Sequence, residues 1–87
     1  MGEKERLMVT AMEECAEIQQ GMSKALHFGV NNHHPDESCV TNGYQVMKEF
    51  CELKAVMDML VIKRYIPPIS EEEQHQIYRD KIDTIEK

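Results

Sequence analysis

Hydrophobic residues recur every three or four positions over residues 3–28, and polar or charged residues fill most positions between them. Projected at 100° per residue, one side of this segment carries Leu7, Met8, Ala11, Cys15, Ile18, Met22, Ala25 and Leu26. The pattern predicts an amphipathic helix from about Glu3 to about Phe28. This helix should end near Gly29, because residues 29–43 contain several Asn, a Pro and a second Gly, which is typical of a connecting loop.

A second apolar stretch covers residues 44–65, where hydrophobic side chains reach most of the helical circumference. It predicts a central helix, the most buried of the molecule, that is ended by Pro67 and Pro68. A third helix should start at Ser70, whose side chain can form a capping box with Glu73. The apolar side of this third helix would consist of Ile77, Tyr78, Ile82 and Ile85.

Signals for β-strands, internal repeats and a second domain are absent or very weak in the sequence. The predicted fold is therefore all-α: a helical hairpin plus a C-terminal helix, in a single domain over residues 1–87. A chain of this length buries only about two thirds of the surface that its unfolded form exposes, which favours association with a partner.

Two pairs of glutamates border the apolar sides of the first two helices. Glu14 and Glu17 are three residues apart and point the same way, and the same holds for Glu49 and Glu52. If the two helices pack antiparallel, as in a helical hairpin, the four carboxylates can converge on one cleft. Such a cluster needs a neutralising cation, and oxygen ligands favour a hard one: Mg²⁺, with Mn²⁺ as a substitute.

A solvated helix face explains a charge cluster equally well, so on the residues alone this alternative stays open beside the metal site. A di-iron carboxylate bundle is a weaker alternative, because its Glu-x-x-His motif is missing. Gly21 lies on the same side as Glu14 and Glu17, and the missing side chain leaves room for a ligand or a neighbouring backbone. Lys24, also on that side, would offer a point charge suited to a phosphate.

Several other residues are better explained by structure than by chemistry. The segment "HHPDESC" offers His33, His34 and Cys39 as zinc ligands, but their spacing matches no zinc pattern. Asp58 follows Lys54 by four residues, as an exposed ion pair would. The three cysteines form no CxxC pair, and together with the methionines they are expected to pack in the core.

The chain has 16 acidic and 10 basic residues and a formal net charge of -6. An acidic protein repels nucleic acid and anionic membranes, so neither is an expected partner. No apolar run reaches the length of a membrane span, and the first residues lack the apolar core of a secretion signal. These features predict an intracellular protein.

The segments "EECAEIQQGMSKALHFG" and "EFCELKAVMDML" resemble the MazG-like all-α nucleoside triphosphate pyrophosphohydrolases, in particular the short single-domain versions of phages and bacteria. The resemblance covers roughly residues 5–62. It implies that an EExxE segment and a second acidic pair hold the Mg²⁺ bound to the substrate's phosphates. The matching metal-binding and catalytic residues are Glu14, Glu17, Glu49 and Glu52.

The same resemblance implies that Lys24 contacts phosphate and that Glu13, Gln20 and His27 are further substrate-binding residues. It also implies a homodimer or a dimer of dimers built as a four-helix bundle, located in the cytoplasm and acting in nucleotide metabolism. Two residues depart from the family pattern: Glu52 stands where an aspartate is usual, and Met59 replaces a polar residue.

The expected function is Mg²⁺-dependent hydrolysis of a nucleoside or deoxynucleoside triphosphate to the monophosphate and pyrophosphate. The alternative from another class is a small helical dimer without catalysis, which acts as an adaptor or regulatory protein. In that case the glutamate rows would be solvated or would contact a basic partner.

Overall fold

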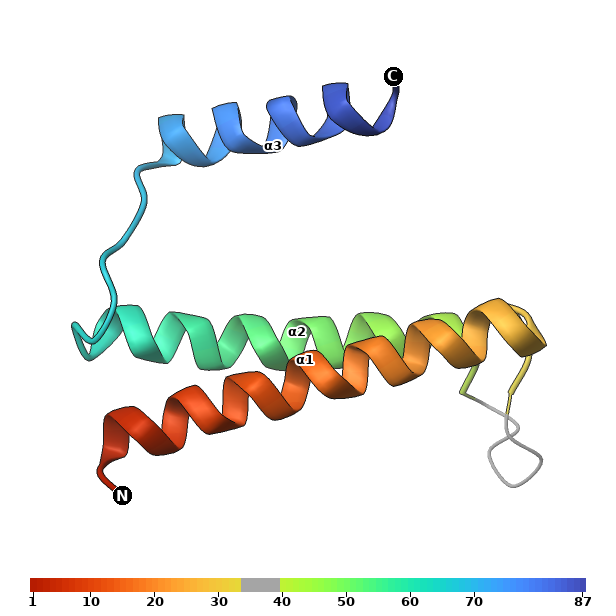
Figure 1. The fold of residues 1–87 in the computed structure, drawn as a ribbon, viewed down its shortest axis with the longest axis horizontal. Helices are drawn as coiled ribbons and strands as arrows, with labels where there is room; N and C mark the ends of the chain where they lie inside the picture. Colours follow the sequence, from red (N-terminus) through yellow and green to blue (C-terminus); the bar gives the residue numbers. More distant parts are fainter. Residues whose placement is uncertain (34–39) are drawn as a thin grey trace.

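The computed structural model describes residues 1–33 and 40–87, which form three helices (Figure 1). They are α1 (Glu3–Phe28), α2 (Asn42–Ile62) and α3 (Glu71–Ile85). Within the two described ranges there is no β-strand, and a single isolated bridge joins His33 to Thr41. The all-α fold and the bounds of the first helix are confirmed.

The helices α1 and α2 pack side by side in opposite directions and form a helical hairpin (Figure 1). Their contact is lined by one row of side chains from each helix, and Val46 and Leu60 of α2 are its buried apolar residues. The facing row of α1 is half-buried and consists of Leu7, Ala11, Ile18 and Ala25. The hairpin therefore has a narrow apolar seam rather than a full core.

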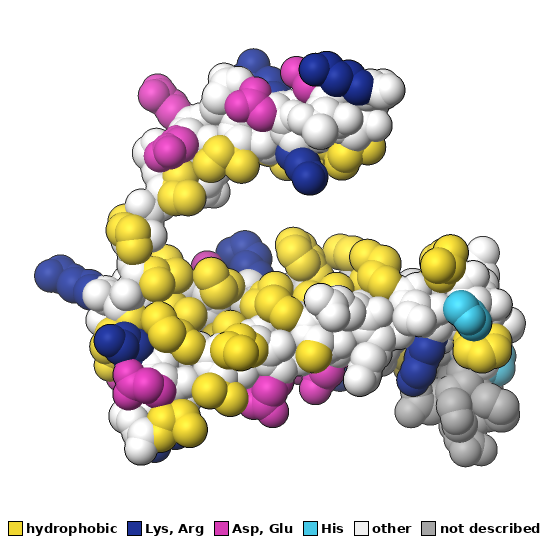
Figure 2. All heavy atoms as spheres, in the orientation of Figure 1, with side chains coloured by type: hydrophobic (Ala, Val, Ile, Leu, Met, Phe, Trp, Pro, Cys, Tyr) yellow, Lys and Arg dark blue, Asp and Glu magenta, His cyan; other side chains and the backbone are white. Residues whose placement is uncertain are grey.

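A second apolar row on each helix stays exposed. We call these residues the apolar flank, which consists of Met8, Met12, Cys15, Met22 and Leu26 of α1 with Met47, Phe50 and Met57 of α2. Hydrophobic side chains are gathered over the visible face of the α1–α2 pair in Figure 2. In the single chain, the expected core positions of the methionines and of Cys15 and Cys51 are thus wrong. Cys39 lies outside the described residues.

The second helix also differs from its prediction at its end. It stops at Ile62, because Arg64 takes a left-handed conformation with a φ of 64°. The Arg64 amide donates to Val61 O and the Tyr65 amide to Leu60 O, both at 2.9 Å, as in a Schellman motif. This turn ends the helix before Pro67 is reached. It is the most buried helix, as predicted, because Val46, Glu49 and Leu60 lie on it, but Met47 and Phe50 on its other side are 57% and 51% exposed.

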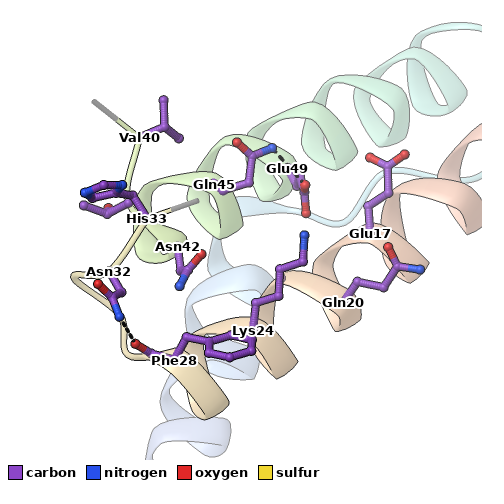
Figure 3. Close-up of a pocket in the computed structure, with 12 residues that line it drawn as sticks. Glu17, Gln20, Lys24, Phe28, Asn32, His33, Val40, Asn42, Gln45 and Glu49 are labelled. Carbon is purple, nitrogen blue, oxygen red and sulfur yellow. Dashed lines mark hydrogen bonds between the residues drawn. The ribbon is translucent and has the colours of Figure 1, made fainter. Parts of the chain in front are cut away.

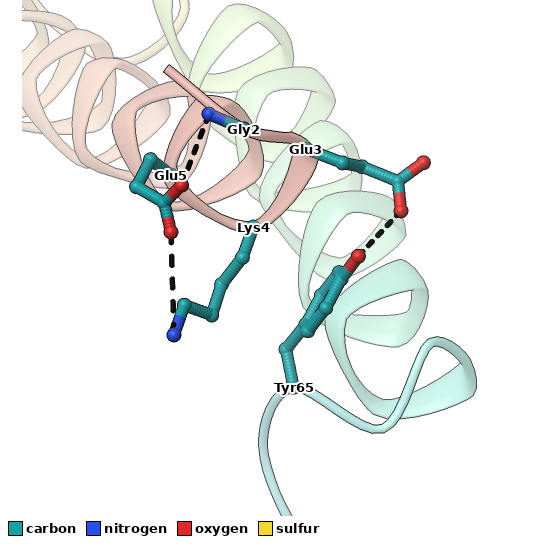
Figure 4. A network of polar contacts seen from close by, with 5 residues as sticks. All are labelled: Gly2, Glu3, Lys4, Glu5 and Tyr65. Atoms are coloured by element: carbon teal, nitrogen blue, oxygen red, sulfur yellow. Dashed lines mark hydrogen bonds and ion pairs between the residues drawn. The ribbon is translucent and has the colours of Figure 1, made fainter.

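The segment after this turn is tied to the start of α1. The Tyr65 hydroxyl donates to Glu3 Oε1 at 2.7 Å, and Lys63 Nζ lies 3.5 Å from Glu3 Oε2 (Figure 4 shows the Tyr65 bond). The hydrogen bond from Tyr65, with the nearby Lys63 charge, lowers the pKa of Glu3 below its usual value. The network fixes where the chain leaves the hairpin.

The third helix begins where the sequence predicted. Ser70 is its N-cap residue, and its hydroxyl accepts a hydrogen bond from the Glu73 amide at 3.2 Å. The helix makes no contact with α1 or α2. Its apolar side, formed by Ile77, Tyr78, Ile82 and Ile85, is exposed.

The chain is flat, with principal extents of 42, 41 and 17 Å. Its radius of gyration is 15.8 Å, whereas a compact domain of this length would have about 12 Å. Among the described helices, none is long and apolar enough to cross a membrane.

Candidate functional site

The glutamate pairs of α1 and α2 lie on the side of the hairpin opposite the apolar flank. Because the helices are antiparallel, Gly21 of α1 comes directly against Val46 and Glu49 of α2. A Cβ atom at Gly21 would stand 2.9 Å from Val46 Cγ2 and 3.4 Å from Glu49 Oε2. The room that was expected at Gly21 is thus taken by side chains of α2.

Glu49 is a charged residue in the seam of the hairpin, with 8% of its surface exposed. Its Oε1 accepts a hydrogen bond from Gln45 Nε2 at 3.0 Å. Its Oε2 is shielded from solvent and has no hydrogen-bond partner among the described residues. A buried carboxylate oxygen without a partner is costly, so it marks a place where a bound cation or water would be stabilised.

Glu14 has the same feature on the facing helix. The side chain is half-buried, and its Oε2 is shielded and lacks a hydrogen-bond partner in the described part of the chain. Burial raises the pKa of Glu14 above its usual value, and the negative charges of Glu17, Glu52, Glu49 and Glu13 raise it further. The carboxylates of both helices therefore act on one another electrostatically, as the sequence pattern predicted.

The other two glutamates are more exposed. Glu52 pairs with Lys48, whose Nζ lies 3.9 Å from Glu52 Oε1, and both side chains are about half exposed. An ion pair of this kind adds little stability and leaves the carboxylate available. Glu17 points from α1 into a pocket that also contains Glu49 (Figure 3).

This pocket has a volume of about 570 Å³ and lies between α1, α2 and the ends of the segment that joins them. Its charged lining residues are Glu17, Glu49 and Lys24, and Lys24 extends into it from α1 (Figure 3). Lys24 makes no ion pair with a carboxylate of the described residues. One cation and two carboxylates thus share a space large enough for a small ligand.

Four side-chain amides add polar groups to the same lining: Gln20, Asn32, Asn42 and Gln45. Two of them also hold the ends of the connecting segment. Asn32 Nδ2 donates to Phe28 O at 2.6 Å, and Asn42 Nδ2 donates to Gly29 O at 3.0 Å. Thr41 caps α2, because its hydroxyl accepts from the Tyr44 amide at 3.1 Å.

The predicted site residues are therefore only partly brought together. Glu17, Gln20, Lys24 and Glu49 line the pocket. Glu14 and Glu52 lie beside it, within electrostatic range of each other. Glu13 raises the pKa of Glu14 but does not line the pocket. His27 does not line it either; its ring packs edge-on against Phe28, with 6.1 Å between ring centroids.

The pocket amides Asn32, Asn42 and Gln45 were missed as site residues in the sequence. Only the position of Gln45, four residues before Glu49, gave a signal. Of the three residues considered and set aside as zinc ligands, His33 borders the pocket, whereas His34 and Cys39 fall outside the described residues. Asp58 is confirmed in an exposed ion pair with Lys54 at 3.0 Å.

The fit to a metal ion is partial. Within residues 1–33 and 40–87, no three His, Cys, Asp or Glu side chains are arranged closely enough to hold one. Yet the oxygens without partners on Glu14 and Glu49 belong to facing helices, and an all-oxygen donor set suits Mg²⁺ or Mn²⁺. A complete set would also need the carboxylates of Glu17 and Glu52, which are exposed.

Comparisons with family models, with curated proteins and with solved structures found no match for this chain.

Proposed function

We propose that the protein is a Mg²⁺-dependent pyrophosphohydrolase that converts a nucleoside or deoxynucleoside triphosphate into the monophosphate and pyrophosphate. The observation that carries the proposal is a pair of shielded oxygens, on Glu14 and Glu49, that lack a hydrogen-bond partner among the described residues and lie beside a pocket lined by Lys24. The resemblance of the two glutamate segments to MazG-like enzymes supports the choice of reaction.

In this proposal Glu14, Glu17, Glu49 and Glu52 hold the metal ion. Mg²⁺ bound there would neutralise phosphate charge and make an attacking water more acidic. One of these carboxylates, or Glu13, would orient that water and accept its proton. The water oxygen would bond to the α-phosphorus of the substrate. The bond from the α-phosphorus to the bridging oxygen would break, and pyrophosphate would leave with that oxygen.

Other pocket residues would hold the substrate. Lys24 would bind the phosphate tail, since its ammonium group has no carboxylate partner in the described part of the chain. Gln20 and the other pocket amides would offer hydrogen bonds to the sugar or the base, with Glu13 and His27 as further substrate contacts outside the pocket of the single chain.

The assembly belongs to the same proposal. We infer a homodimer, or a dimer of such dimers, in which two α1–α2 hairpins form a four-helix bundle through their apolar flanks. Leu26, Met12 and Met22 are 84%, 68% and 57% exposed, which supports this assembly. A large exposed apolar patch on a protein surface usually marks a contact with another molecule. The carboxylate side of each hairpin would face away from that contact.

The test is to incubate the purified protein with Mg²⁺ and each common ribo- and deoxyribonucleoside triphosphate, and to separate the products by chromatography. We expect monophosphate and pyrophosphate in equal amounts, lost on chelation and in Glu49→Gln. The matched control is Glu72→Gln on α3, which removes the same charge far from the pocket.

The apolar flank also favours the second candidate, a non-catalytic helical adaptor or regulatory dimer. If no triphosphate is consumed with Mg²⁺ or Mn²⁺, the hydrolase is ruled out and the adaptor becomes the leading function. A location in the cytoplasm and a role in nucleotide metabolism are proposed together with the hydrolase.

A further inference from the structure

The third helix carries an apolar side that no described residue of its own chain covers. Ile77, Tyr78 and Ile85 are 50%, 67% and 67% exposed, and α3 does not touch α1 or α2. In Figure 2, hydrophobic side chains lie along the edge of α3 that faces the hairpin and along the facing edge of the hairpin, with open space between them. Two apolar surfaces thus face one another without meeting.

In the structure, the connection to α3 leaves these two surfaces apart. Tyr65 is anchored to Glu3, and the chain then passes through Pro67 and Pro68, whose rings restrict the backbone. Residues 67–70, at about 3.1 Å per residue for an extended proline segment, span about 12 Å. One helix with its side chains is about 10–12 Å wide. A connection of this reach is long enough for one further layer of helix to fit between α3 and the hairpin.

The exposed area indicates what fills the gap. The chain exposes 7334 Å², whereas a compact monomeric protein of 10.1 kDa would expose about 5300 Å². The excess is about 2000 Å² per chain, more than twice the roughly 800 Å² per partner of a standard interface. An area of this size is large enough for an obligate interface with a second copy of the chain.

We propose that α3 is an arm that packs on a second copy of this chain: the partner's hairpin enters the space between α3 and the α1–α2 pair. A two-fold axis makes the contact reciprocal, so each copy places its Ile77 and Ile82 on the other copy's hairpin. One partner thereby covers both unpartnered apolar surfaces. This proposal rests on the dimer of the proposed function but not on its hydrolase activity. The arm can therefore be tested, and refuted, independently of whether triphosphates are cleaved.

The first test is the dissociation constant of the dimer, measured by analytical ultracentrifugation. In Ile82→Glu the constant should rise about 10-fold or more, because a charge replaces an apolar side chain at the contact. In the matched control Gln76→Glu, which adds the same charge on the opposite side of α3, it should change less than about two-fold. Equal constants for Ile82→Glu and the natural protein would overturn the proposal, as would a natural protein that is monomeric.

The second test places the contact directly and does not depend on the stability of a variant. A photo-crosslinking amino acid at Tyr78, on the exposed apolar side of α3, is irradiated in a mixture of isotopically light and heavy chains. We expect covalent dimers in which mass spectrometry joins a light α3 peptide to a heavy α1 or α2 peptide. Crosslinks only within one chain would show that α3 folds back on its own hairpin and would refute the exchange.

Discussion

Gly21 in α1 and Val46 in α2 are in contact across the hairpin, and a Cβ atom at Gly21 would come within 2.9 Å of Val46 Cγ2. In an isolated helix, Gly21→Ala would add about 1 kcal/mol of stability. Here the added methyl meets a branched side chain of limited rotation, and overpacking of this kind costs about 1–3 kcal/mol. We therefore expect Gly21→Ala to lower the free energy of unfolding by about 1 kcal/mol in urea titrations.

A double-mutant cycle provides the control for this prediction. In a Val46→Ala background the methyl group that causes the clash is gone, so Gly21→Ala should be neutral or stabilising. If Gly21→Ala stabilises the protein in the natural background as well, the contact between the two helices is looser than the structure indicates.

The acidic side of the hairpin yields a prediction on pH. Because the pKa of Glu14 is raised in the folded protein, the folded state holds a proton there more tightly than the unfolded state. The ionised form of Glu14 thus lowers the free energy of unfolding at neutral pH. This destabilisation disappears as the pH falls through the raised pKa and Glu14 becomes protonated. Glu14→Gln should raise the melting temperature of the metal-free protein at pH 7, with a smaller gain near pH 4.

Two controls accompany the Glu14 experiment. Glu71→Gln removes the same charge from the first turn of α3, where a carboxylate is favourable, so it should lower the melting temperature slightly and not raise it. The Glu3 carboxylate acts in the opposite direction, since its lowered pKa gives stability that is lost on acidification. Comparing Glu14→Gln with the natural protein at each pH cancels that contribution. If Glu14→Gln raised the melting temperature by the same amount at both pH values, repulsion between Glu14 and the neighbouring carboxylates would not be the cause.

Most of the fold was predictable from the sequence, because helix periodicity and capping residues act locally. The bounds of α1 and the cap at Ser70 follow from such signals. The end of α2 could not be predicted in this way, because it depends on a left-handed conformation of Arg64, and arginine is not a residue that signals such a turn in the sequence. The pattern also marked Cys15 and Phe50 as apolar, but it could not tell a position inside the hairpin from one that a partner would cover.

The candidate site was predictable to a similar degree. The spacing of Glu14, Glu17, Glu49 and Glu52 set their side of each helix, and antiparallel packing brought them within electrostatic range. The pocket amides Asn32 and Asn42 flank the connecting segment, and only the folded chain brings them together with Lys24. Loop residues carry no periodic pattern, so sequence spacing alone could not place them.

Lys24 offers a test of substrate binding that is separate from the metal ligands. A hydrogen bond between charged groups contributes about 1.5–3 kcal/mol. Lys24→Met should therefore lower kcat/KM for a triphosphate by about 10- to 100-fold, chiefly through KM. Lys54→Met is the matched control, because Lys54 pairs with Asp58 on an exposed surface and does not line the pocket. An unchanged KM in Lys24→Met would remove Lys24 from the binding site.

Arg64 gives a last prediction, at the turn where the hairpin passes into the α3 connection. Its φ of 64° lies in the region that costs a residue with a Cβ about 1–2 kcal/mol, and glycine escapes this cost. Arg64→Gly should therefore raise the free energy of unfolding by about 1 kcal/mol, provided the turn keeps its hydrogen bonds to Val61 and Leu60. Arg64→Ala separates the backbone effect from loss of the arginine side chain, because alanine keeps the strain. Equal stability of Arg64→Gly and Arg64→Ala would show that the turn is not held in this conformation.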